Sequence, residues 1–222
     1  MASDQEVYEA RREAAPPLVF ATGLLVSLAL VSEVKHWQVL YLPWWSWFVP
    51  AAAASVLSID LGMRAGGLPL VRSRAVAFVL ISVLVVGNLV ALGSLIAGLV
   101  GVSRKDLSGG ELLFTAAVIW TTNIVAFGLL FWEVADEGPL ARMRHGRRRP
   151  DFQFPQDGDD ASEWSPQIWD YLYVSLTNSI AFSPTDALPL TLRAKGLMAL
   201  GSLISVVTLL LVGARAVNIL GT

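Results

Sequence analysis

Hydroxyl, amide and carboxylate side chains gather between two apolar segments near the C-terminal end of the chain. Groups of these types can line a polar route or coordinate a small ion. At membrane depth they cost free energy unless they are packed inward or hydrated. The expected pore or binding residues, with the phenylalanine among them, are Thr177, Asn178, Ser179, Phe182, Ser183, Thr185 and Asp186.

Two roles are open to this cluster. Thr177, Asn178 and Ser179 are consecutive, so they cannot share one helix face, and part of the helix must contact protein or water all round. The cluster either lines a hydrated pore or cavity, or its members hydrogen-bond across helices and hold a bundle together. For Asp186 a third role is open, because an acid shortly before a helix is favoured by the dipole at the helix N-terminus.

Composition predicts the elements that must position these groups. Of the 222 residues, 55% are hydrophobic and 15% are charged, and the mean hydropathy is +0.59. A soluble domain of this length is not so apolar. Apolar runs of roughly 20 residues recur, which is the length that crosses a bilayer as a helix. We therefore expect an all-α, multi-pass transmembrane helical bundle that forms a single domain over residues 1–222.

The bundle is expected to have five or six spans, with six preferred. The fifth is short, about 15 residues or roughly 22 Å as a helix, so a re-entrant segment resembling a pore helix is the alternative. A full crossing is favoured because the two ends of this segment suit opposite membrane interfaces. Trp164 and Trp169 lie at one end and the Pro184–Pro189 turn at the other. A charged cytoplasmic loop, residues 135–166, precedes it. The spans cover about residues 14–32, 44–63, 75–102, 111–134, 167–183 and 193–220.

Basic residues in the short loops predict the orientation. With a cytoplasmic N-terminus, the loops that join the first four spans place only Lys35, Arg104 and Lys105 on the opposite side of the membrane. With six spans both termini are cytoplasmic and Asp186 and Arg193 face outward. With five spans the short segment dips into the membrane and returns, so that a hairpin opens toward the cytoplasm.

Other polar residues are expected to be structural. Asn88 and Asn123 lie within the third and fourth spans and are expected to hydrogen-bond between helices. Asp136 lies near the cytoplasmic end of the fourth span, where it is expected to reach the headgroups or to pair with Arg142.

No catalytic arrangement is visible in the sequence. The chain has no cysteine, and its two histidines, His36 and His145, both fall in loops, so neither a paired-histidine metal site nor a Ser-His-Asp arrangement can be built in the membrane. A phosphate-binding glycine loop is also missing. We expect no enzyme activity, no metal and no cofactor. A net charge of −2 without a basic, aromatic surface predicts no nucleic-acid partner.

A run of residues over the last quarter of the chain supports a family resemblance. It consists of Asp170-Tyr171-Leu172-Tyr173, Thr177, Phe182, Asp186, Thr191, Arg193-Ala194-Lys195, Leu200, Ser205 and Ala216-Val217-Asn218-Ile219-Leu220. This run resembles the C-terminal region of the bacterial membrane family called domain of unknown function 1345. The resemblance implies a location in the bacterial cytoplasmic (inner) membrane and implies no activity.

The order of a short helix, a Pro-containing turn and a long apolar helix is similar to the potassium-channel pore module. Phe182–Asp186 stands where that module has its selectivity filter. A filter of backbone carbonyls depends on glycines, and this segment has none and contains Pro184. A hairpin entered from the cytoplasm also has the opposite orientation. The resemblance therefore implies a channel-like arrangement without potassium selectivity.

These observations predict a channel-like or transporter-like protein that permeates a small ion or solute. The alternative is a non-conducting membrane scaffold or regulatory partner, whose charged loop at residues 135–166 binds another protein. The expected partners are the lipid bilayer, further copies of the chain in a homo-oligomer, and a small ion.

Overall fold

The structure is a computed structural model that describes residues 12–37, 43–62, 74–99, 109–145, 150–158, 164–183 and 186–220. Within these ranges seven α-helices dominate, which confirms the predicted all-α class. They are α2 (Ala15–Val34), α3 (Phe48–Gly62), α4 (Arg74–Leu99), α5 (Gly109–Val134), α6 (Pro139–His145), α7 (Ile168–Ala181) and α8 (Leu192–Leu220).

Short elements connect and flank the helices. Four 3₁₀ turns are η1 (Arg12–Ala14), η2 (Trp44–Trp47), η3 (Ala135–Glu137) and η4 (Pro155–Gly158). Two strands, β1 (Phe152–Gln153) and β2 (Leu188–Pro189), form a small antiparallel ladder in the described part of the chain.

Four of the helical stretches are long and apolar enough to cross a membrane. They run over Arg12–Val34, Ala75–Ala97, Gly109–Glu137 and Leu192–Ala214, and a shorter apolar helix covers Trp44–Ile59. The helix ends agree with the expected spans to within about four residues. The preferred number of six spans is not confirmed, because α7 has only 14 residues.

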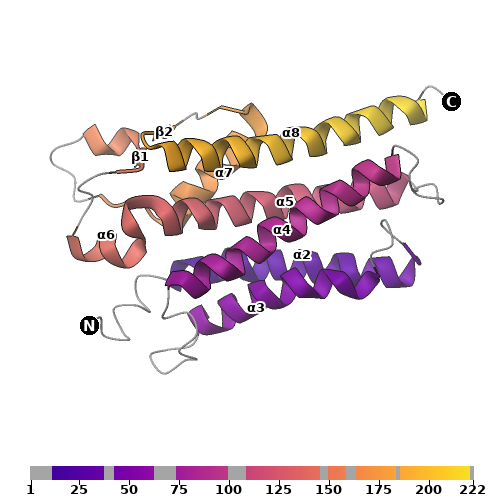
Figure 1. Cartoon of the computed structure of the whole chain (residues 1–222), viewed down its shortest axis with the longest axis horizontal. Coiled ribbons are helices and arrows are strands. Elements are labelled where there is room, and N and C mark those ends of the chain that lie inside the picture. The colour runs from indigo at the N-terminus through magenta and orange to yellow at the C-terminus, as the bar shows by residue number, and fades with distance from the viewer. Residues whose placement is uncertain are drawn as a thin grey trace.

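α5 is the central helix of the bundle. It packs against α2, α4, α7 and α8, while α2 and α3 pair with each other (Figure 1). The most apolar stretch of α5 is 72% buried, against 28–39% for the other three long helices. The outer helices therefore expose apolar side chains, as membrane helices facing lipid do.

The two strands show how the chain passes through α7. Phe152 pairs with Pro189 and Gln153 with Leu188, so the segments before and after α7 meet at one end of the molecule. Figure 1 shows both strands at the end where α8 begins, with α7 entering between α5 and α8. We call α7 together with the returning residues 186–190 the α7 hairpin.

The connection between α5 and α7 differs from the expected irregular loop. It contains η3, α6, β1 and η4. Phe152 and Phe154 are 0% and 5% exposed and pack their rings against Tyr171 of α7, with centroids 5.9 and 5.5 Å apart. Apolar side chains two residues apart are typical of a short strand with one buried face, so this part of the connection belongs to the core.

Candidate functional site

The ends of α7 have clear local causes. At its start Gln167 and Asp170 form a capping box, in which the backbone N–H of Gln167 donates to the Asp170 carboxylate at 2.7 Å. The N–H of Ile168 donates to Glu13 at 3.4 Å, which ties the helix to the beginning of α2. At its end Phe182 has a left-handed backbone conformation, with φ 52°, which stops the helix.

Two glycines allow α7 and α8 to approach α5 closely. A Cβ atom added to Gly128 of α5 would lie 2.6 Å from Cδ2 of Leu172 and 3.1 Å from its Cα. A Cβ atom on Gly201 of α8 would lie 3.1 Å from the ring of Phe127. Small residues at membrane-helix contacts permit this kind of approach, so α7 is held against α5 by backbone proximity.

Hydrogen bonds join α7 to α8. The Asn178 side-chain amide donates to the Met198 carbonyl oxygen at 2.9 Å, and the Ser202 hydroxyl donates to the Asn178 carbonyl oxygen at 3.2 Å. Asn178 and Ser179 are 3% and 2% exposed. Thr177 donates to the carbonyl oxygens of its own helix. Three of the expected site residues therefore lie in or beside the contact between helices.

Further polar contacts cross the middle of the bundle. Thr122 of α5 donates to the Asn88 side chain of α4 at 2.8 Å. The Asn123 amide donates to the Gly201 carbonyl oxygen at 3.1 Å and to the Ser205 hydroxyl at 3.0 Å on α8. These bonds confirm the predicted interhelical role of Asn88 and Asn123.

The tip of the α7 hairpin has a different environment. Ile180 and Phe182 are 56% and 47% exposed, and Ser183 and Asp186 are exposed as well. The Tyr173 hydroxyl donates a hydrogen bond to the Asp186 carboxylate. Thr185 lies outside the described residues. The structure thus separates the expected site into a buried group on α7 and an exposed group at and after its end.

An ionic cluster stands where the α7 hairpin returns to the end of the bundle. Asp151 is fully buried and accepts two hydrogen bonds from Arg193, one of them from Nε at 2.7 Å. It also accepts a hydrogen bond from the Thr191 hydroxyl at 2.5 Å. Asp136 and Asp151 each accept the other's backbone N–H at 3.0 Å. The Asp151 cluster, defined as Asp136, Asp151, Thr191 and Arg193, therefore joins η3 after α5, the residue before β1 and the start of α8.

The cluster favours the ionised form of Asp151. Burial alone would raise the pKa of this carboxyl, but hydrogen bonds from Arg193, Thr191 and the Asp136 amide, with the charge of Arg193, hold the pKa below its ordinary value. The backbone beside this contact is constrained as well. Asp136 and Glu137 adopt left-handed conformations with φ 53° and 66°. Such conformations persist in non-glycine residues only where the surroundings enforce them.

Arg142 completes this end of the bundle. Its guanidinium donates to the carbonyl oxygens of Trp132 and Ala135 at 2.9 and 2.7 Å, which satisfies the last turn of α5. It also lies over the ring of Tyr171, 5.2 Å from the centroid. Tyr171 thus contacts both the arginine and the aromatic residues that follow β1.

Sequence reasoning did not identify the Asp151 cluster. Asp151 was one of many charges in the connection, and Arg193 is 42 residues further along the chain. The alternation of Phe152 and Phe154 next to Asp151 was the available signal, since two apolar residues on one face predict a buried strand.

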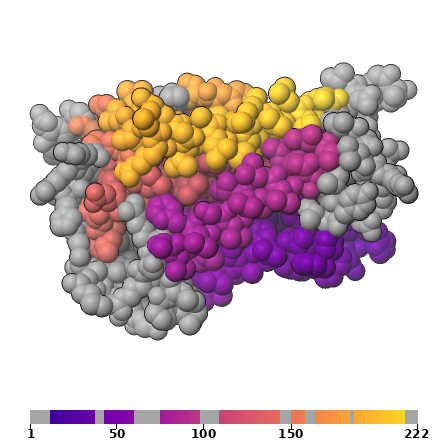
Figure 2. All heavy atoms as spheres, in the orientation of Figure 1, coloured from indigo at the N-terminus to yellow at the C-terminus, as the bar shows by residue number. Residues whose placement is uncertain are grey.

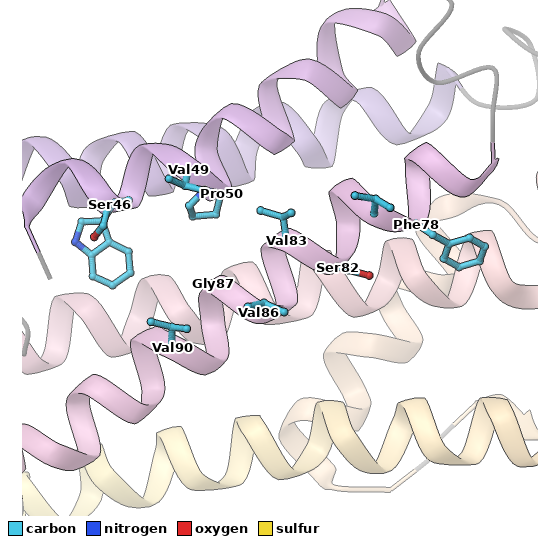
Figure 3. A pocket seen from close by; sticks show the side chains of 11 residues that line it. Ser46, Val49, Pro50, Phe78, Ser82, Val83, Val86, Gly87 and Val90 are labelled. Carbon is cyan, nitrogen blue, oxygen red and sulfur yellow. The ribbon is translucent and has the colours of Figure 1, made fainter.

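A separate groove lies on the outer surface between α3 and α4. It has a volume of about 630 Å³, and Pro50 of α3 and Val83, Val86, Gly87 and Val90 of α4 are among its lining residues (Figure 3). The lining is almost wholly apolar and contains none of the expected site residues. This surface suits apolar contact.

Known proteins give no further assignment: no family model, curated protein or solved structure matches the chain. Among the described residues no group of three or more histidine, cysteine or acidic residues could hold a metal ion.

Proposed function

We propose that this chain is a membrane protein that permeates a small ion, with the exposed tip of the α7 hairpin on the route. One observation carries the proposal: the exposed, non-helical residues Phe182 and Ser183 follow the inner end of α7, and the exposed carboxylate of Asp186 lies on the way back to β2. A backbone segment without regular secondary structure is tolerated at membrane depth only where protein covers it or where it lines a water-filled cavity.

The depth of the tip follows from its contact with α8. Asn178, four residues before Phe182, accepts a hydrogen bond from Ser202. Ser202 lies next to the middle of the 23-residue stretch Leu192–Ala214, roughly 15 Å from its start at 1.5 Å per residue. The helix of the hairpin therefore ends near the centre of the apolar layer.

The membrane topology that fits this arrangement has five crossings and a hairpin entered from the cytoplasm. α2 begins and α8 ends at opposite ends of the bundle (Figure 1). The end from which α7 enters also holds α6 and the start of α8 (Figure 1). With η1, which precedes α2, these elements carry Arg12, Arg142, Arg193 and Lys195, and cytoplasmic ends carry the excess of basic residues. A bacterial cytoplasmic membrane is proposed from the family resemblance of the last quarter of the chain.

In this proposal the two groups of site residues have different roles. Asn178, which bonds to α8, and Ser179, which is also buried, hold the hairpin in place. Phe182, Ser183 and Asp186 face the route. A carboxylate at the mouth of a narrow passage raises the local concentration of cations, so a small cation is the expected substrate.

Ion flux into proteoliposomes tests this proposal. We expect Asp186→Asn to lower cation flux several-fold, and Asp186→Lys to lower it further while raising anion flux, because the substitution reverses the charge. Glu137→Gln is the matched control, since Glu137 is an exposed carboxylate outside the α7 hairpin. Flux at the wild-type level in both Asp186 variants would contradict the proposal that the hairpin lies on the route.

A non-conducting scaffold is the second candidate. It is supported by the buried Asn178 of α7, whose hydrogen bonds join α7 to α8 and so hold the helices together. A purified wild-type protein that passes neither cations nor anions above the level of empty liposomes would contradict permeation and favour this role.

A further inference from the structure

Leucines face outward where the α7 hairpin returns and continues into α8. Leu188, Leu190 and Leu192 are 58%, 46% and 88% exposed, whereas Ala187 is 2% exposed. Leu188 and Leu190 flank one residue of extended chain, so their side chains share a face, and Leu192 is the first residue of α8. Figure 2 shows the beginning of α8 on the surface at one end of the molecule. We call Leu188, Leu190 and Leu192 the leucine strip.

The leucine strip lies at the boundary of the apolar layer. The part of α8 that is apolar enough to cross a membrane starts at Leu192, so Leu188 and Leu190 come just before it. Trp169, in the first turn of α7, is 55% exposed near the same end of the bundle, and indole rings prefer the headgroup level. At this level water reaches the backbone of the extended chain, while leucine side chains can enter the acyl chains.

Two exposed cations follow the leucine strip. The buried Asp151 carboxylate holds Arg193 through Nε and Nη2. A guanidinium has five N–H groups, and the others of Arg193 make no contact within the described part of the chain, so they are oriented and available to a partner outside it. Lys195 is exposed and has no acidic partner among the described residues. Asp136 and Glu137 add negative charge near Arg193, so Lys195 carries most of the attraction for an anion.

We propose that the leucine strip, Arg193 and Lys195 form a binding site for a phospholipid at the cytoplasmic face of the membrane. The leucines contact the acyl chains, and the guanidinium and ammonium groups bind the phosphate, a group that both commonly bind in proteins. Basic residues combined with leucine and tryptophan side chains are the composition of segments that lie in the membrane interface. The inference rests on the membrane location in the proposed function and is independent of permeation.

Spin labels on single cysteines test the position of the leucine strip, and the chain has no cysteine of its own. Leu188→Cys and Leu190→Cys are labelled in the full-length protein in membranes of phosphatidylcholine and phosphatidylglycerol. The access of oxygen and of a water-soluble nickel complex to each label is then measured. Leu203→Cys, on the exposed face of α8, is the reference inside the bilayer, and Glu137→Cys is the aqueous reference. We expect both strip labels to have values between the two references.

Either of two other results overturns the lipid site. Nickel access at Leu188→Cys and Leu190→Cys equal to that at Glu137→Cys would place the strip in water. Shielding of both labels from both reagents would mean that protein covers the strip. The label at Leu203→Cys separates these failures from a failure of the proposed function: nickel access there would contradict the membrane location itself.

Lys195→Gln tests the phosphate contact, with Lys35→Gln as the matched control, an exposed lysine after the far end of α2. Native mass spectrometry measures the binding of added phosphatidylglycerol to each protein in detergent. We expect Lys195→Gln to weaken binding several-fold, because one charge near the lipid is lost, and Lys35→Gln to leave it unchanged. Equal binding by all three proteins, or displacement of the lipid by inorganic phosphate, would overturn the site.

Discussion

Asp151 organises the cytoplasmic end of the proposed topology at the scale of single residues. Its carboxylate is buried yet accepts hydrogen bonds from Arg193, Thr191 and a backbone amide. A bidentate arginine contact gives geometric specificity as well as free energy. Because Arg193 is 51% exposed, water can solvate its charge if the partner is lost.

We expect Asp151→Asn to lower the free energy of unfolding by about 1.5–3 kcal/mol, the range for hydrogen bonds to a charged group. The measurement is reversible unfolding in detergent. Glu137→Gln, an exposed carboxylate two residues before Pro139, should change stability by less than about 0.5 kcal/mol. Equal loss in both variants would contradict a specific role for Asp151.

The ion pair also predicts a pH dependence. The pKa of Asp151 is lower in the folded protein than its ordinary value of 3.8. Its contribution to stability is therefore fully present above about pH 4 and is lost as the pH falls through the folded pKa. We expect the difference in stability between wild type and Asp151→Asn to shrink on acidification below pH 4. A difference that stays constant down to pH 2 would contradict the assignment.

Helix contacts decide the position of α7 at the scale of elements. α7 has only 14 residues and joins the bundle through close approach to α5 and hydrogen bonds to α8. Its amino end is held by the capping box and its far end by Asn178. A helix so short is not stable alone in water or as a membrane span, so these contacts position it.

Gly128→Val is expected to displace α7 from α5. The added side chain would collide with Leu172, and overpacking typically costs about 1–3 kcal/mol. Gly23→Ala is the control, since nothing lies within 4 Å of its Cβ position and alanine favours the helix. Thermal unfolding in detergent measures both. Leu172→Ala in the Gly128→Val background should restore part of the loss, because it removes the atom that the new side chain meets. No recovery would locate the strain elsewhere.

Asn178→Leu is expected to loosen the contact between α7 and α8. It removes the bond to the Met198 carbonyl oxygen, and such bonds contribute about 0.6–1.7 kcal/mol in membrane proteins. Proteolysis of the hairpin in detergent should become faster. Thr177→Val is the comparison, because Thr177 bonds only to carbonyl oxygens of its own helix among the described contacts, and it should have the smaller effect.

At the scale of the whole molecule the direction of the chain supports the proposed five crossings. β1 and β2 bring the segments on both sides of α7 to one end, and α8 then runs the length of the bundle (Figure 1). The end from which α7 enters carries Arg12, Arg142, Arg193 and Lys195, and this group of basic residues is the basis for the proposed cytoplasmic N-terminus.

Five crossings predict that the two ends of the chain lie on opposite sides of the membrane. Alkaline phosphatase, which is active only outside the cytoplasm, should be active when fused after α8 and inactive when fused before α2. A fluorescent protein that folds only in the cytoplasm should give the reverse pattern. Two cytoplasmic ends would instead support six spans.

Local composition was sufficient to predict the helices. Apolar runs of about span length, broken by Gly and Pro, determine where an α-helix can cross a bilayer. The expected limits 75–102, 111–134 and 193–220 are close to Arg74–Leu99, Gly109–Val134 and Leu192–Leu220 for that reason. Asn88 and Asn123 were also predictable, because an amide within a membrane helix needs a partner on another helix.

The division of the candidate site was not predictable from the sequence. The sequence does not show which polar residues in and after the short helix α7 face the rest of the protein. Only the packing of the helices buries Asn178 and leaves Asp186 exposed.

The sequence by itself determined the helices, four of them long and apolar enough to cross a membrane, and the place in the chain where polar groups gather, because both depend on neighbouring residues. The tertiary structure alone decided that Asp151 meets Arg193 across 42 residues and that the chain returns to the end from which α7 enters. These contacts depend on how separate helices pack, and periodicity along one helix carries no information about the face its neighbours occupy.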